Sequence, residues 1–163
     1  MGARSKLREG GLEILNRKVS QRYFILERFE AGIVLWGTEI KSLREGKAQI
    51  AEAFVRIDRL GRPWMHNAHV ESYSHGTDAN HSAVRARELL LHRREINRLR
   101  VAAEKEGMTL IPLRLHIEHG LAKVDVGLCK GKQFRDRRED LRRETAMREA
   151  QKAIADRIRG KHP

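Results

Sequence analysis

The segment from Lys130 to Pro163 cannot supply the centre of a hydrophobic core, because charged side chains dominate it. It contains twelve Lys and Arg residues and six Asp and Glu residues, and so holds half of the chain's net charge of +12. Any core must therefore be built from the residues that precede it. A polybasic segment binds a polyanion by releasing the counterions of that polyanion. The segment predicts RNA or DNA as the partner.

The composition favours one domain plus an extension. A chain of 163 residues has room for a single core of ordinary size. Only 5% of the residues are aromatic, so we expect recognition through phosphates and shape rather than through many base stacks. The single cysteine, Cys129, excludes an internal disulfide and a multi-cysteine zinc site. Residues 1–15 lack the apolar run of a secretion signal and no later stretch resembles a membrane span, so we expect a cytoplasmic protein without membrane contact.

Branched and aromatic residues predict strands in the first half of the chain. Residues 22–29 (RYFILERF) form the first expected strand, and Glu30-Ala31-Gly32 form a tight turn before a second strand at residues 33–43. Gly37, inside that second strand, is expected to mark a bulge or a bend. The next two expected strands are residues 53–58 and 64–73.

The second half predicts a helix and then a hairpin. From Arg87, apolar residues recur at helical spacing until Gly107 ends the pattern. Residues 108–117 and 122–128 alternate with period two, and Pro112 restricts its strand to an edge or an irregular position. Short antiparallel strands with a helix before the last pair predict a mainly β fold with an inserted helix. We expect a small antiparallel barrel of the oligonucleotide-binding (OB) type.

Three regions follow from these patterns. Residues 1–15 are expected to form a flexible leader, residues 16–132 the barrel, and residues 133–163 a basic tail. The tail has a thin apolar stripe inside arginine and glutamate. A helix of this kind is marginal alone, so we predict a tail that is disordered until it binds and helical afterwards. The stripe consists of Leu141, Met147, Ala150, Ile154 and Ile158.

Enzymatic readings find little support in the residues. The pairs His66/His69 and His116/His119 have the spacing of metal ligands on a helix, but they fall on predicted strands or a turn, where side chains three apart diverge. A nuclease built from His and Lys remains an alternative, although nothing pairs the required groups. The stretch Gly127–Gly131 lacks the full spacing of a phosphate-binding loop. We expect no enzyme, no metal and no cofactor.

Charged residues outside the tail allow two interpretations each. Glu30 is either a solvated turn residue or a carboxylate that accepts a hydrogen bond from a base. Lys41, Arg44 and Lys47 either solubilise an edge or add to a basic face. For the arginines that flank or lie on the expected helix, binding is the preferred interpretation. These are Arg85, Arg87, Arg93, Arg94, Arg98 and Arg100.

Several ordered blocks resemble the SsrA-binding protein family, also called small protein B. They cover nearly the whole chain from Asn16 onward. The blocks are Asn16-Arg17-Lys18, Tyr23-Phe24-Ile25, Glu30-Ala31-Gly32-Ile33, residues 37–44 (GTEIKSLR), Gly46-Lys47, Asn80-His81, residues 89–92 (LLLH) with Glu95-Ile96, residues 107–113 (GMTLIPL), Gly127, Gly131-Lys132 and Asp136-Arg137-Arg138.

The resemblance implies a non-enzymatic, monomeric adaptor. Its barrel would bind the tRNA-like domain of transfer-messenger RNA, and the charged RNA, with elongation factor Tu, would enter the A site of a ribosome stalled on an mRNA without a stop codon. The basic tail would fold in the empty mRNA channel, and the nascent chain would be tagged for proteolysis. A tail that folds only in a vacant polyanionic channel turns that vacancy into binding energy.

The resemblance also implies site residues. For RNA binding by the barrel these are Asn16, Arg17, Glu30, Leu90, Lys123, Lys130 and Lys132, to which the basic face adds Lys41. For the ribosomal decoding site they are Arg135, Asp136, Arg137 and Arg138. Without the resemblance, Leu90 fits a core position. The alternative function is a general ribosome-associated protein whose tail threads ribosomal RNA.

Overall fold

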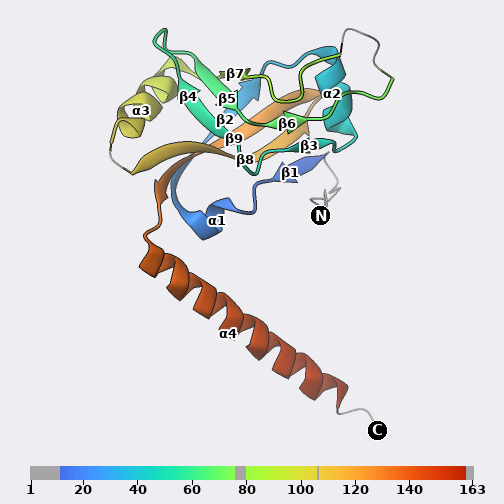
Figure 1. The fold of residues 1–163 in the computed structure, drawn as a ribbon, viewed down its shortest axis with the longest axis vertical. Helices are drawn as coiled ribbons and strands as arrows, with labels where there is room; N and C mark the ends of the chain where they lie inside the picture. The colour runs from blue at the N-terminus through green and yellow to red at the C-terminus, as the bar shows by residue number, and fades with distance from the viewer. Residues whose placement is uncertain (1–11, 76–79, 106, 161–163) are drawn as a thin grey trace. The chain divides into compact units, whose positions relative to one another are not determined.

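The computed structural model describes residues 12–75, 80–105 and 107–160, and the chain divides into two units between Gly131 and Lys132. Figure 1 shows strands wrapped together in the first unit, the barrel unit, and one long helix in the second, the tail unit. The elements are β1 (Glu13–Leu15), α1 (Val19–Arg22), β2 (Tyr23–Ile33), α2 (Gly37–Arg44), β3 (Ala48–Gln49), β4 (Phe54–Ile57), β5 (Pro63–His66), β6 (His69–Val70), β7 (Arg87–Leu90), α3 (Arg93–Ala103), β8 (Met108–Glu118), β9 (Leu121–Gly131) and α4 (Phe134–Arg159).

The main sheet closes on itself. Its strand order is β1-β8-β4-β5-β7-β2-β9. The last strand, β9, also pairs with β8, and this pairing closes the ring. Every pairing in it is antiparallel. Closure removes the free edges that an open sheet would expose. The predicted mainly β fold, an antiparallel barrel with an inserted helix, is confirmed.

The core lies inside this ring. Phe29, Ala31 and Ile33 alternate along β2 and point inward, and every second residue between them points outward. They meet Val124 and Val126 of β9, which are fully buried. Other core residues contributed by the ring strands are Val55, Met65, Leu89, Leu110 and Leu115.

The expected turn at Glu30-Ala31-Gly32 is wrong. β2 continues through these residues, which pair with Asp125, Val124 and Lys123 of β9. Gly32 also pairs with Leu90 of β7, so hydrogen bonding on both sides outweighs the turn tendency of glycine. A Cβ on Gly32 would lie 3.4 Å from the Cβ of Leu90, so the glycine allows a close approach here.

The expected strand at residues 33–43 is also wrong, because Gly37–Arg44 form helix α2. Glu39, Ser42 and Leu43 have the spacing of one helix face and are buried together. The backbone N–H of Trp36 donates to Oε2 of Glu39 at 2.8 Å and caps the first turn. Gly37 therefore begins a helix and marks no bulge.

Two further boundaries differ from expectation. The strand expected at residues 64–73 is divided into β5 and β6 at Asn67, whose φ is 57°. The helix expected from Arg87 begins only at Arg93, because residues 87–90 form β7 between β5 and β2. Pairing with two neighbouring strands overrides the helical spacing in that segment.

The strand expected at residues 53–58 and the closing hairpin are confirmed, as β4 and as β8 with β9. His119 and Gly120 form the hairpin turn with φ values of 49° and 77°. Pro112 stands beside a register shift between Pro112 and Arg114, the irregular position that its missing N–H requires.

The predicted leader extends too far. β1 pairs with β8, and Leu12 and Ile14 belong to the core, so residues 12–15 are part of the barrel unit. The remainder of the predicted leader, residues 1–11, lies outside the described residues.

The tail unit is dominated by α4. No α4 residue whose side chain the structure describes is buried. Local contacts stabilise the helix: Arg148 Nη2 lies 2.6 Å from Glu144 Oε1, one turn away, and Thr145 Oγ1 donates to the Leu141 carbonyl at 2.9 Å. That the tail is disordered before binding stays a prediction. Neither α4 nor another helix in the described part of the chain is both long and apolar enough to cross a membrane.

Candidate nucleic-acid interface

Three of the predicted RNA-binding residues meet on the outer surface of the barrel. Glu30 on β2, Lys123 on β9 and Leu90 on β7 belong to adjacent strands. Gly32 pairs with Lys123 on one side and with Leu90 on the other, so it connects the two in the sheet. Leu90 is 58% exposed, so its interpretation as a core residue is wrong. A leucine this exposed is available for an apolar contact with a ligand.

An ion-pair cluster surrounds Lys123. Its Nζ donates to Oε1 of Glu30 at 3.0 Å and to Oε2 of Glu118 at 3.2 Å. The hydrogen bonds to Glu30 and Glu118 raise the pKa of the Lys123 ammonium, and the bond from Lys123 lowers the pKa of Glu118. Both groups therefore stay charged over a wide range of pH. The cluster presents a fixed donor and fixed acceptors to a ligand.

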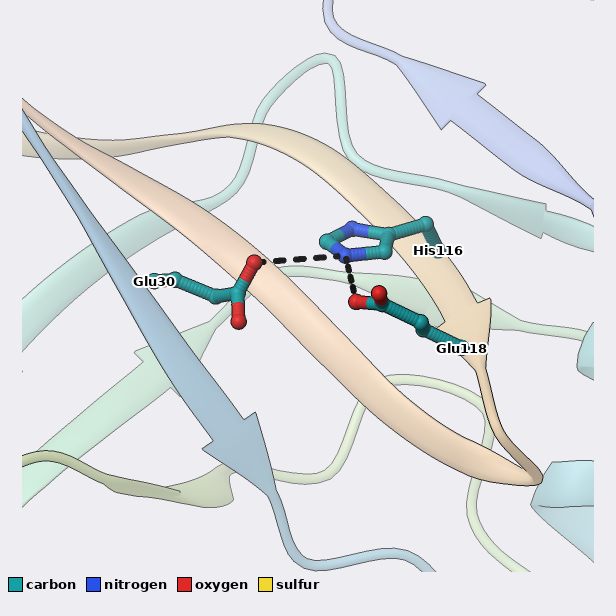
Figure 2. Close-up of side chains that lie close together, drawn as sticks. All are labelled: Glu30, His116 and Glu118. Carbon is teal, nitrogen blue, oxygen red and sulfur yellow. Dashed lines mark ion pairs between the residues drawn. The ribbon is translucent and has the colours of Figure 1, made fainter. Parts of the chain in front are cut away.

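His116 lies beside the carboxylates of Glu30 and Glu118, as Figure 2 shows. Its Nε2 is 3.7 Å from Glu30 Oε2 and 4.0 Å from Glu118 Oε2, and the residue is only 8% exposed. His119, which has the sequence spacing of a second metal ligand, is on the hairpin turn and 89% exposed at its side chain. The two histidines do not converge. His66 stacks on Phe54 with ring centroids 5.2 Å apart, while His69 is exposed.

The cluster has the donor types of a metal site. Glu30, His116 and Glu118 each offer one ligand atom, and these atoms lie within 4.8 Å of one another. However, the Lys123 ammonium binds both carboxylates and already supplies the positive charge that a metal ion would bring. The residues therefore fit an ion-pair cluster better than a metal centre.

Asn16 has a structural position. It is 8% exposed, and its Nδ2 donates to the carbonyls of Ile50 and Pro112, both at 3.1 Å. These bonds connect the end of β1 to β8 and to the segment before β4. Arg17, next in the chain, is exposed.

The other predicted lysines stand apart from the Lys123 cluster. Lys41 is exposed on α2, with its Nζ 5.2 Å from the ring centroid of Tyr73. Lys130 is exposed near the opposite end of β9, where it pairs with Phe24. The stretch Gly127–Gly131 is part of β9 and forms no phosphate-binding loop. A Cβ on Gly127 would lie 2.9 Å from Leu113 Cδ1, so this glycine serves packing.

The predicted decoding-site residues occupy the first turns of α4. Arg135 is 90% exposed at its side chain, with its Nε 4.0 Å from Glu139 Oε1. Asp136 lies in the first turn, where a negative charge complements the helix dipole. Arg137 donates from Nε and Nη2 to the Lys132 carbonyl at 3.3 and 3.2 Å, and Lys132 forms an ion pair with Asp140. Arg138 follows in the same helix.

A buried charge network went unrecognised in the sequence. Glu39 and Arg87 are both 0% exposed. Glu39 accepts from Arg87 Nε at 2.9 Å and from Arg85 at 2.9 and 2.5 Å. The expectation that Arg85 and Arg87 bind RNA is wrong, because both guanidinium groups bind the carboxylate of Glu39. Burial alone would raise the pKa of Glu39, but the hydrogen bonds from Arg85 and Trp36 and the nearby guanidinium charges lower it. The only feature that distinguishes Arg87 from the exposed arginines is its position in β7, where the alternation of side chains points it inward.

The exposed side chain of Leu90 and the ion-pair cluster around Lys123 lie on the wall of a small barrel, and the chain carries a net charge of +12. These features define a barrel-type nucleic-acid-binding protein. The family model described as SmpB protein matches residues 13–156. The chain belongs to this family.

The sequences of known SsrA-binding proteins are similar to this chain over most of their length. An SsrA-binding protein of Geobacillus thermodenitrificans is 45% identical over 149 residues, which cover 91% of this chain and 96% of the relative. One of Shouchella clausii is 47% identical, covering 93% and 97%, and one of Corynebacterium efficiens is 49% identical, covering 89% and 88%. A solved structure described as "tmRNA-SmpB: a journey to the center of the bacterial ribosome" is similar with a TM-score of 0.64 and 41% identity, covering 75% of this chain and 85% of that one.

Proposed function

We propose that this chain is the RNA-binding adaptor of trans-translation. Its barrel binds the tRNA-like domain of transfer-messenger RNA and delivers that RNA to stalled ribosomes, and elongation factor Tu takes part through the charged RNA. The C-terminal tail senses the empty mRNA channel, and the nascent chain is tagged for proteolysis. The protein acts as a cytoplasmic monomer and performs no catalysis.

The observation that carries the proposal is the agreement over nine-tenths of the chain with relatives named SsrA-binding protein. The solved structure named for transfer-messenger RNA, SmpB and the ribosome supports the same partners. The geometry is consistent with it. The cluster of Glu30 and Lys123 offers hydrogen-bond groups of both kinds, and Leu90 offers apolar area beside them.

The site residues take different parts in this proposal. Glu30, Leu90 and Lys123 touch the RNA on one surface, and Arg17, Lys41, Lys130 and Lys132 add positive charge elsewhere. Asn16 acts through the fold, because its amide is bonded to two main-chain carbonyls. Arg135, Asp136, Arg137 and Arg138 are proposed to contact the decoding site.

A competition titration tests the proposal. Purified protein is titrated into a labelled tRNA-like domain at near-physiological salt, with excess ordinary transfer RNA as competitor. We expect saturable binding that survives the competitor. Equal loss of binding to the competitor, with a steep salt dependence, would favour the general ribosome-associated alternative.

Truncation after Phe134 tests the division of labour between the units. We expect binding to transfer-messenger RNA to stay near the full-length value while tagging of the nascent chain is abolished. Loss of RNA binding in the truncated chain would contradict the assignment of that binding to the barrel.

A lysine comparison tests the cluster. Lys123→Ala should weaken binding about tenfold, because the two carboxylates lose the ammonium that neutralises them. Lys105→Ala removes an exposed lysine between α3 and β8 that has no part in the cluster of Glu30, Glu118 and Lys123, and it serves as the matched control. Equal effects of the two substitutions would show that only total charge matters.

A further inference from the structure

The surface that carries Glu30 continues beyond the end of β2. Successive residues of an extended chain point to opposite sides, so Glu30, Gly32, Val34 and Trp36 share one face, the outer β2 face. Val34 is 43% exposed and Trp36 53% exposed, whereas Ile33 is buried and Leu35 packs against the core. The outer β2 face therefore extends from the Lys123 cluster to an exposed indole.

Leu90 connects the two ends of this face. It lies beside Gly32, and two residues earlier in β7 the carbonyl of Glu88 accepts the N–H of Val34 at 3.0 Å. Leu90, Val34 and Trp36 thus follow one another along the boundary between β2 and β7. Neither Val34 nor Trp36 is among the residues assigned to RNA binding above.

The indole of Trp36 is held from one side. The guanidinium carbon of Arg85 lies 4.6 Å from its ring centroid. That guanidinium is fixed by Glu39, and Arg85 also donates to the carbonyls of Ala86 at 3.2 Å and Val34 at 3.4 Å. Because Glu39 also accepts the Trp36 N–H, one buried carboxylate positions both the backbone and the cation that packs on the ring.

Arg85 therefore covers one face of the ring, while the residue as a whole is still 53% exposed. A ring fixed on one side and open on the other has the geometry of a stacking platform. Glu88 has the same strand parity as Leu90 and brings a carboxylate to this part of the face, which disfavours a phosphate here. A base, which stacks through its π face, avoids that repulsion.

We infer that Trp36 stacks on an unpaired base of the RNA bound at the Glu30, Leu90 and Lys123 surface. The inference rests on the proposed function and deepens it, by adding a base contact to a surface otherwise assigned to hydrogen bonds and shape. Continuity with that surface favours RNA over a protein partner as the occupant. Arg85 and Glu39 are positioning residues for the platform.

The two tryptophans of the chain allow a direct test. Trp64 is on β5, where it pairs with Glu88 of β7, and its Nε1 donates to Asp58 at 3.0 Å; it is not one of the residues of the outer β2 face. Trp64→Phe leaves Trp36 as the sole tryptophan in the full-length protein. On titration with the tRNA-like domain we expect quenching of Trp36 fluorescence and protection of Trp36 from acrylamide. Unchanged emission and accessibility at saturation would overturn the inference.

Affinity gives the second readout. Trp36→Ala should weaken binding about 5- to 150-fold, the range of one base–aromatic stack, and Trp36→Phe should recover a large part of it. The Trp36 N–H to Glu39 bond involves the main chain, so it survives both substitutions. Leu60→Ala, at a residue 79% exposed in the turn between β4 and β5, is the matched control and should have no effect. Wild-type affinity in Trp36→Ala, or equal weakening by Ala and Phe, would overturn the stacking role.

The two failures are distinguishable. If the wild-type protein loses the tRNA-like domain to ordinary transfer RNA, the proposed function fails and the inference fails with it. If the wild type binds selectively while Trp36→Ala binds equally well without a fluorescence change, only the inference fails.

Discussion

The barrel unit and the tail unit use charged side chains in opposite ways. The barrel unit completely buries Glu39 and Arg87 and pairs them with each other. Helix α4 keeps its described side chains out of any core and pairs some of them one turn apart. A buried pair holds a fold together because separation would leave a charge unsolvated. Surface charges contribute little to stability, but they can exchange their partners for a polyanion.

The largest effect expected is in the barrel unit. Glu39→Gln removes the charge that compensates Arg85 and Arg87, and the free energy of unfolding should fall by about 3–5 kcal/mol. Denaturation followed by tryptophan fluorescence reports on this unit alone, because Trp36 and Trp64 both belong to it. Glu52→Gln, at an exposed pair with Lys18, is the control and should lower the free energy of unfolding far less than Glu39→Gln, because solvent screens the exposed pair. Equal losses would contradict the distinction between buried and exposed charges.

A proline in α4 should destabilise the tail unit and leave the barrel unit unchanged. Ala150→Pro lies in the interior of α4 and should cost about 3 kcal/mol of local helix stability. We expect circular dichroism to show less helix, while the fluorescence-detected unfolding midpoint of the barrel unit stays unchanged. A shifted midpoint would mean that the two units are stabilised together.

The thiol of Cys129 should make the stability of the barrel unit sensitive to alkaline pH. Burial raises the pKa of Cys129 from 9.0 to about 11. The unfolded chain therefore loses this proton first. The corresponding stability is fully present below pH 9.0 and is lost as the pH rises towards about 11, by about 2–3 kcal/mol. The difference in unfolding free energy between wild type and Cys129→Ala, measured across this range, isolates the effect. A difference that does not change with pH would contradict it.

The smallest effect is expected in the tail. Glu144→Gln removes the ion pair with Arg148 and should cost about 0.3–0.5 kcal/mol of helix stability, an effect that salt reduces. Helix content from circular dichroism at low and high salt provides the measurement, and Glu149→Gln is the comparison at an exposed position of the same helix. A loss of stability as large as that caused by Glu39→Gln would contradict the distinction between the exposed charge pairs of the tail unit and the buried pair of the barrel unit.

Local patterns predicted the closing hairpin and a tail able to form a helix, and they failed at α2 and β7. The hairpin alternates about a short turn, and its partners are neighbours in sequence. At α2, the branched residues of segment 33–43 favour a strand, but the burial of Glu39 and Leu43 against other segments and the cap between Trp36 and Glu39 favour a helix. At β7, pairing with β2, a strand far away in the sequence, outweighed helical spacing.

Some residues of the candidate site could also be identified from the sequence, whereas others could be identified only from the fold. The family blocks identified Glu30, Leu90 and Lys123 one residue at a time, but their adjacency depends on β9, β2 and β7 lying side by side. His116 and Glu118 joined that cluster only through the fold. Trp36 carried no signal beyond its residue type.

The sequence alone therefore determined the net charge, the basic helical tail, the antiparallel hairpin and the family, because each depends on composition, on near neighbours or on ordered motifs. The tertiary structure decided which charges are buried and which outer residues share a surface. Glu39 and Arg87 are separated by 47 other residues, and nothing local to either one indicates that they meet. Burial and long-range strand pairing depend on the whole chain, and they separate structural arginines from those available to RNA.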